Sequence, residues 1–149
     1  QKTMSEINQA HPDVCAVISV NKGLVTQASA AIPVVPLYFA ILYKVMKKAG
    51  NHENCIQQIA RLFTQKLYTP TGFQTDENGF IRMDDYELTP KIQEEVKKCW
   101  KAVTTDTVKE YCDIDGYWED FYHMFGFRYE DIDYTQDVDA DIEIDGVVM

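Results

Sequence analysis

The pattern of hydrophobic and polar positions begins with one strand-like run and continues with helical ones. Residues 13–20, DVCAVISV, are short, apolar and rich in β-branched side chains, with a proline before them and Asn-Lys-Gly after them. Such a run predicts a buried strand. Residues 23–43 then carry no charge at all, and three lysines followed by Gly50 mark a helix C-terminus beyond them. The first third of the chain is therefore predicted to be a strand, a loop and a helix.

Helical spacing returns in the rest of the chain. From residue 52 to residue 68 apolar side chains recur every three or four positions, which predicts an amphipathic helix with its apolar face against a core. Thr89 and Pro90 open another helix, as an N-cap and a first helical residue. Turn signals between these helices, over 69–88, favour a small hairpin. Two shorter helices are predicted, at 106–112 and 117–125.

The uncharged stretch at 23–43 has the length of a membrane helix, which needs about 20 apolar residues. Its composition argues against that use, because polar side chains occupy its first third and Pro33 and Pro36 interrupt the remainder. Only the 14 residues from 30 to 43 are continuously apolar, and runs of that length are more often buried helices or walls of a site. We therefore expect no membrane span.

The loop at residues 22–26 joins the predicted strand to the proline-opened helix. In open α/β sheets, ligands bind beyond the carboxyl ends of the strands, where loop backbone groups are free to contact them. This order of elements makes the loop a candidate binding site. The alternative is an ordinary connection in which Thr26 caps the following helix.

Charge is unevenly distributed along the chain, whose formal net charge is −10. Residues 1–75 carry 7 basic and 3 acidic side chains, whereas residues 76–149 carry 7 basic and 21 acidic ones. This balance repels phosphate backbones, so no nucleic-acid partner is expected. The four cysteines are scattered without a CxxC pair, which predicts free thiols in a reducing, cytoplasmic setting. His52 and Cys55 share a helix face, but no second pair completes a metal site, and none is expected.

Five blocks of sequence carry a resemblance to a known family and together cover nearly the whole chain. In order they are LVTQASAAIPVVPLYFAILYKVMK, HENCIQQIARLF, GFIRMDDYEL, GYWEDFYHMFGF and IDYTQDVDADIEI. They are similar to the C-terminal part of the bacterial trans-2-enoyl-CoA reductase family, which includes NADH-dependent enoyl-acyl-carrier-protein reductases and is related to the short-chain dehydrogenases. The resemblance implies an α/β fold: the C-terminal part of a Rossmann-type parallel sheet, mostly helical here, with one core strand and a small hairpin.

The resemblance also implies an activity in fatty-acid metabolism. In this family NADH gives its nicotinamide hydride to the β-carbon of an α,β-unsaturated thioester, carried on coenzyme A or acyl carrier protein. The family's nicotinamide-side contact falls on Leu24, Val25 and Thr26. Helices after that loop wall the acyl pocket, and the corresponding lining positions are Ile32, Val35 and Tyr38.

The catalytic residues that the family implies, a tyrosine and a lysine nine positions later, are expected upstream of Gln1. No glycine-rich phosphate turn occurs in this chain either, because its glycines are isolated from one another. Tyr38 and Tyr43 precede Lys47 by nine and four positions, yet on a helix only Tyr43 shares a face with Lys47. Lysines at that position are also what a helix C-terminus prefers. We therefore expect no catalytic residue in this segment.

The chain is accordingly expected to be a single segment, 1–149, of a larger reductase whose N-terminal portion is its missing partner. Within it, residues 1–26 would hold the last-strand region and cofactor loop, 27–128 the substrate-pocket helices and hairpin, and 129–149 an acidic tail.

Two other functions fit parts of the pattern. One is a non-catalytic helical acyl-binding or protein-interaction module with an aromatic groove, formed by Tyr117, Trp118, Phe121, Tyr122 and Phe125. Their helical spacing fits core packing equally well. The other is a membrane-associated helix, which the lysines before Gly50 favour and the two prolines oppose.

Overall fold

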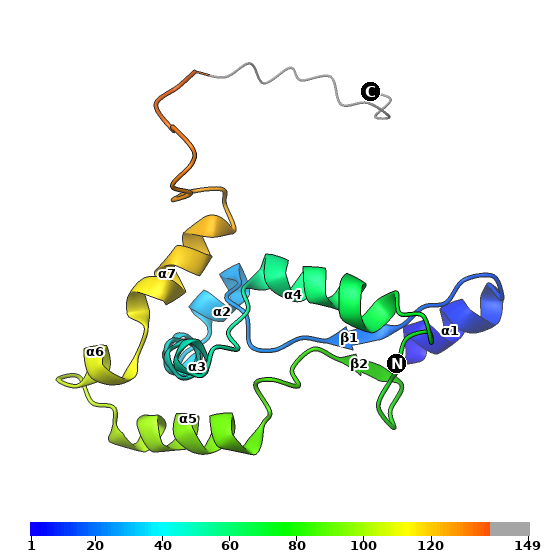
Figure 1. The fold of residues 1–149 in the computed structure, drawn as a ribbon, viewed down its shortest axis with the longest axis horizontal. Coiled ribbons are helices and arrows are strands. Elements are labelled where there is room, and N and C mark those ends of the chain that lie inside the picture. The colour runs from blue at the N-terminus through cyan, green and yellow to red at the C-terminus, as the bar shows by residue number, and fades with distance from the viewer. Residues whose placement is uncertain (138–149) are drawn as a thin grey trace.

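The computed structural model describes residues 1–137 and shows helices packed mainly on one another, with a two-stranded parallel sheet to one side (Figure 1). Residues 138–149, the larger part of the predicted acidic tail, lie outside the described residues. The elements are α1 (Lys2–Ala10), β1 (Ile18–Val20), α2 (Gln27–Ala31), α3 (Val35–Ala49), α4 (Cys55–Arg61), the π-helix η1 (Leu62–Leu67), β2 (Phe80–Arg82), α5 (Pro90–Ala102), α6 (Val108–Tyr111) and α7 (Ile114–His123).

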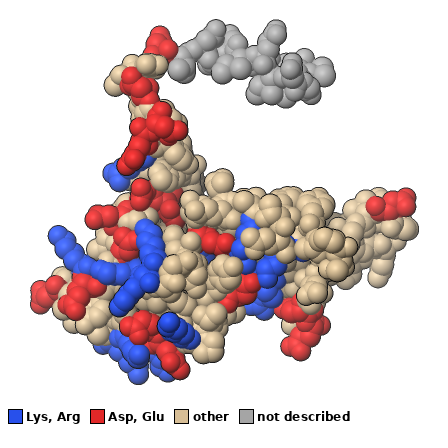
Figure 2. Space-filling model, viewed as in Figure 1, with Lys and Arg blue, Asp and Glu red and all other residues tan. Residues whose placement is uncertain are grey.

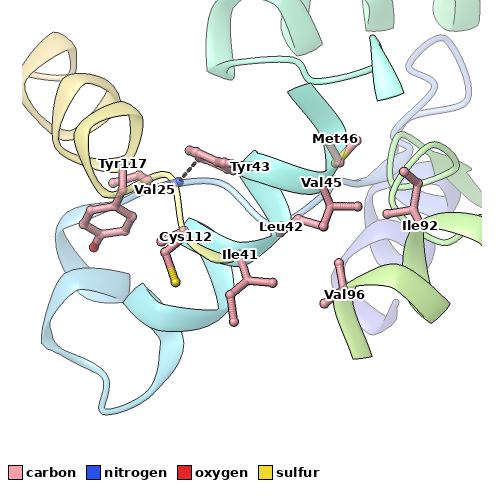
Figure 3. Packing of buried hydrophobic residues seen from close by; sticks show 11 residues of the cluster. Val25, Ile41, Leu42, Tyr43, Val45, Met46, Ile92, Val96, Cys112 and Tyr117 are labelled. Carbon is pink, nitrogen blue, oxygen red and sulfur yellow. Dashed lines mark hydrogen bonds between the residues drawn. The ribbon is translucent and has the colours of Figure 1, made fainter. Parts of the chain in front are cut away.

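Helix α3 is the centre of the core. Pro36 lies in its first turn, and Gly50 ends it in a left-handed conformation with φ of 74°, as the sequence predicted. Residues 40–43, 45 and 46 are buried, so the middle of the helix is covered on more than one face, as in a core helix rather than a surface one. Helix α5 contributes Ile92 and Val96 to the same cluster, and α7 contributes Tyr117 (Figure 3).

The sheet pairs β1 with β2 in parallel, with Ser19 opposite Ile81. The predicted hairpin over 69–88 is present only as a turn, in which Asp76 Oδ1 accepts hydrogen bonds from the N–H groups of Asn78 and Phe80. The pairing expected of that hairpin was wrong. Ile81 is fully buried, and β2 has β1 as its strand partner rather than the residues before the turn.

The predicted amphipathic helix at 52–68 also differs from the structure. It is divided into α4 and η1, and the apolar side chains expected to face the core are exposed, by 70% at Ile56, 46% at Ile59 and 45% at Phe63. The buried face carries Gln58 and Arg61 instead.

Arg61 explains this inverted burial. Its side chain is 5% exposed; Nε lies 2.6 Å from Glu53 Oε1 and Nη1 lies 3.0 Å from Asp85 Oδ1. Nη2 donates to the Met83 carbonyl at 2.8 Å, and the guanidinium lies over the Tyr86 ring. Because a guanidinium offers five donors in one plane, it can satisfy this whole set of acceptors at once. The network joins α4 to the segment after β2.

The predicted strand at 13–20 is shorter than expected, and its three paired residues are half-buried. The segment after α7 leads away from the helices as far as residue 137, and Figure 2 shows acidic side chains along it. Among the residues that the structure describes, no helix is both long enough and apolar enough to cross a membrane.

Candidate functional site

The 22–26 loop lies directly beyond the carboxyl end of β1 and leads into α2. Thr26 is the N-cap of α2: its Oγ1 accepts a hydrogen bond from the Ser29 N–H at 3.0 Å, and Ser29 Oγ accepts one from the Thr26 N–H at 2.8 Å. This capping box fixes the direction in which the chain leaves the loop. The Thr26 residue is exposed, and its Oγ1 remains able to donate its own hydrogen to a ligand.

Tyr43 holds the middle of the loop from α3. Its hydroxyl oxygen accepts a hydrogen bond from the Val25 N–H at 3.2 Å, drawn as the dashed line in Figure 3. Tyr43 is fully buried and Val25 is 5% exposed, so this bond forms inside the core. A backbone donor there would be costly to leave without a partner.

Glu87 holds the start of the loop from the segment between β2 and α5. One carboxylate oxygen accepts a hydrogen bond from the Gly23 N–H at 2.6 Å, and the other accepts one from the Tyr38 hydroxyl at 2.6 Å. Sequence reasoning missed Glu87, because it lies 64 positions beyond Gly23 and no local pattern distinguishes it from the other acidic residues.

Gly23 is needed at this position because α3 passes close to it. A Cβ on residue 23 would lie 2.6 Å from Phe39 Cε1 and 3.1 Å from Phe39 Cδ1. A larger residue would therefore require either the Phe39 ring or the loop to shift.

Lys22 is an unusual buried cation beside the loop. It is 3% exposed; Nζ donates to the Gly23 carbonyl at 3.1 Å and lies 4.8 Å from the centroid of the Tyr43 ring. Burial lowers the pKa of Lys22 to about 8, against the attraction of nearby carboxylates, of which Glu87 is the strongest. Lys22, Tyr43 and Glu87 thus surround the loop with polar groups removed from solvent.

His52 packs against this cluster and gives it a measurable pH dependence. Its ring centroid lies 4.4 Å from that of Tyr43, and burial, followed by the charges of Lys22 and Lys47, lowers the pKa of His52 to about 4 from 6.5, while Asp113 opposes the shift. The unfolded chain therefore binds this proton at higher pH than the folded chain. As pH falls from about 6.5 towards about 4, His52 should destabilise the fold progressively.

Urea unfolding at about pH 7 and about pH 5 tests this expectation. Replacing His52 with Gln should reduce the loss of unfolding free energy between the two pH values. The matched variant His11→Gln, at an exposed histidine, should leave that loss unchanged. An equal pH dependence in both variants would contradict the role given to His52.

The three residues predicted to line an acyl pocket do not share one cavity in this chain. Ile32 is 50% exposed, and Val35 and Tyr38 are half-buried. Of the three, only Tyr38 lines a groove of about 500 Å³, together with residues of α5 that include Val96 and Trp100. Among the described residues, the three predicted positions therefore do not enclose a common pocket.

The tyrosine–lysine pairs within α3 are each engaged elsewhere. Lys47 Nζ lies 2.6 Å from Asp113 Oδ2, Tyr43 binds the Val25 N–H, and Tyr38 donates to Glu87. The expectation that α3 provides no catalytic pair stays a prediction.

The aromatic residues of the last helix do not form the groove considered for a binding module. Tyr117 is 4% exposed and belongs to the core, whereas Trp118 and Phe125 are each 44% exposed. Phe121 contacts the rings of both Trp118 and Phe125, so most of these side chains pack on one another.

A second cavity, of about 560 Å³, lies next to the Arg61 network. Three cations line it, but each is already ion-paired: Arg61 and Lys66 with Asp85, and Arg82 with Asp76. A further anion would have to displace a carboxylate, so this cavity is not a ready-made phosphate site.

Comparison with known proteins gives the family of this chain. The family described as the trans-2-enoyl-CoA reductase catalytic region matches residues 1–68, and the one described as the enoyl reductase FAD binding domain matches residues 75–138. The chain belongs to the trans-2-enoyl-CoA reductase family.

Relatives within this family are similar over almost the whole chain. An enoyl-[acyl-carrier-protein] reductase [NADH] of Flavobacterium psychrophilum is 47% identical over 89% of this chain and 34% of its own length. A trans-2-enoyl-CoA reductase [NADH] of Ruminiclostridium cellulolyticum is 48% identical over 89% of this chain and 33% of its own length. The chain thus spans about a third of the length of the curated relatives it matches.

A solved trans-2-enoyl-CoA reductase of Treponema denticola in complex with NAD matches 92% of this chain and 35% of its own, with a TM-score of 0.83 and 46% identity. A Clostridium trans-2-enoyl-CoA reductase in complex with NADH gives a TM-score of 0.82 at 45% identity. This agreement confirms the predicted α/β fold class.

The second family description names a flavin, but the sequence of residues 75–138 has no glycine-rich turn of the kind that binds a dinucleotide. The three glycines there, Gly79, Gly116 and Gly126, are isolated, and Gly116 lies inside α7, so no glycine-rich turn is available for a pyrophosphate.

Proposed function

We propose that this chain is the C-terminal third of an NADH-dependent trans-2-enoyl-thioester reductase of fatty-acid metabolism. The observation that carries the proposal is the 22–26 loop, which follows a parallel strand and is held by hydrogen bonds from the Gly23 and Val25 N–H groups. The chain that contains it is 45% identical to a solved reductase in complex with NADH. The missing N-terminal portion is its partner, and it would supply the catalytic tyrosine and lysine.

Within that enzyme, Leu24, Val25 and Thr26 face the nicotinamide. The Val25 N–H is occupied by Tyr43, and the Val25 side chain lies in the core, so this residue acts by fixing the backbone. The Thr26 hydroxyl is exposed and can donate a hydrogen bond. We assign it the polar contact to the cofactor, and Leu24 an apolar one.

When bound, NADH would supply a hydride for the β-carbon of the enoyl thioester, and the tyrosine of the N-terminal portion would supply the proton that completes the reduction. This chain would orient the nicotinamide face through its loop, and its apolar wall would exclude water from the reacting carbons. Ile32, which follows α2, joins Val35 and Tyr38 of α3 in that wall, and closing it requires the N-terminal portion. The substrate is an enoyl thioester of coenzyme A or acyl carrier protein.

A cytoplasmic location follows from the same assignment. All four cysteines are free thiols, which suits a reducing compartment.

The test compares the isolated chain with an extended protein, in which the residues expected upstream of Gln1 are joined to it. Each is mixed with NADH and crotonyl-CoA, and NADH oxidation is followed by absorbance. We expect oxidation by the extended protein only. Tight acyl-ligand binding by the isolated chain, with no oxidation after extension, would instead support a non-catalytic acyl-binding module.

A further inference from the structure

We propose that Glu87 is a positioning residue that couples the cofactor loop, residues 22–26, to the acyl-pocket helix α3. This inference rests on the proposed function and deepens it, because it assigns a role to a residue that contacts neither ligand. One carboxylate accepts hydrogen bonds from both sides of the site: from the Gly23 N–H of the loop and from the Tyr38 hydroxyl of α3.

The two bonds use both oxygens of a buried carboxylate. Each donor–acceptor distance is 2.6 Å, and Glu87 is 8% exposed. Bonds to an ionised acceptor are shorter and roughly twice as strong as neutral ones. Both partners are donors, so an ionised carboxylate, which only accepts, suits this position. The same surroundings raise the pKa of Tyr38 to about 12, chiefly by burial and then through its bond to Glu87, so Tyr38 stays protonated.

The backbone around Glu87 is itself held in place by hydrogen bonds. Gln93 Nε2, from α5, donates to the Glu87 carbonyl at 2.9 Å, and the Leu88 N–H donates to the Asp84 carbonyl at 2.9 Å. Glu87 therefore has a fixed backbone, and movement of either donor would be resisted by the same side chain.

The geometry joins two parts of the proposed site that are not neighbours in sequence. Gly23 immediately precedes the residues assigned to the nicotinamide, and Tyr38 is the predicted wall residue that lines the groove with α5. A substrate that moves Tyr38 also acts on the carboxylate that holds Gly23. Acyl-chain binding and NADH binding should therefore affect each other through Glu87.

The test is Glu87→Gln in the extended protein. A glutamine has one acceptor oxygen and no charge, so it loses the two charge-assisted bonds, and it could contact both Gly23 and Tyr38 only weakly, with the Tyr38 hydroxyl reversed from donor to acceptor. We expect the KM for NADH to rise about tenfold or more, with a smaller change in kcat, because the loss falls on cofactor placement. The matched control is Glu95→Gln, an exposed glutamate of α5, which should leave both constants unchanged.

A second variant separates coupling from general damage. Tyr38→Phe removes one donor and leaves the Glu87 carboxylate bound to Gly23. In the unmodified enzyme, NADH affinity should change when a saturating acyl ligand is present, and this change should be lost in both variants. Combining the two substitutions should add little to Glu87→Gln alone, since they break the same link. Additive effects, or coupling that survives in both variants, would overturn the proposal.

Hydrogen exchange in the extended protein, which needs no enzymatic turnover, distinguishes failure of this inference from failure of the proposed function. Glu87→Gln should accelerate hydrogen exchange of the Gly23 amide and leave that of the Val25 amide, held by Tyr43, unchanged. Unaltered kinetics in an active extended enzyme would refute the coupling alone. No NADH oxidation by the unmodified extended protein would refute both.

Discussion

Replacing Arg61 with methionine is expected to lower the free energy of unfolding by about 3–5 kcal/mol. The substitution keeps an unbranched side chain but removes the guanidinium that pairs with Glu53 and Asp85 and binds the Met83 carbonyl. The remaining carboxylates would be left in a partly desolvated site without their main partner, which is why breaking such a pair costs more than forming it gains.

Lys66→Met is the matched control for Arg61→Met. Lys66 also pairs with Asp85, at 2.7 Å, but both of these side chains are 32% exposed. Exposed pairs contribute about 0–1 kcal/mol, so this variant should be nearly as stable as the unmodified chain. Urea unfolding of the three proteins measures both effects, and equal losses from the two substitutions would show that the Arg61 network is not a special centre of stability.

Ile41→Ala is expected to cost about 2–5 kcal/mol of unfolding free energy. Ile41 is fully buried in the middle of α3, in the cluster drawn in Figure 3, so the truncation removes apolar contacts and leaves a cavity. Ile56→Ala is the matched control, because Ile56 is an isoleucine of α4 that is 70% exposed. Its loss should stay within about 0.5 kcal/mol in urea unfolding of this chain.

Comparable losses at Ile41 and Ile56 would contradict the structure of the core. A large loss at Ile56 alone would mean that the periodicity of 52–68, which predicts its apolar face inside, describes the folded chain better than the observed burial does.

Elements that depend on local signals could be predicted from the sequence. Gly50 ends α3 and Pro90 opens α5 because glycine and proline preferences act within a few residues, although the N-cap Thr89 makes no side-chain capping hydrogen bond. The division of 52–68 into α4 and η1 could not be predicted in this way. It depends on Arg61 reaching Asp85, which is 24 positions away, and this contact reverses the face that periodicity assigns to the core.

The candidate site shows the same division. The position of the loop after a strand follows from element order. Thr26 also caps α2, which was the alternative to a binding role for this loop. The residues that hold the loop, Tyr43 and Glu87, come from distant segments and have no motif. Ile32, assigned by resemblance to a pocket, is 50% exposed in the described chain.

The most direct test of the central claim is a crystal structure of the extended protein with NADH bound. We predict that the nicotinamide ring lies against Leu24, Val25 and Thr26, with the Thr26 hydroxyl about 3 Å from a polar atom of the cofactor. A nicotinamide bound elsewhere, with no cofactor atom in contact with residues 22–26, would contradict the account.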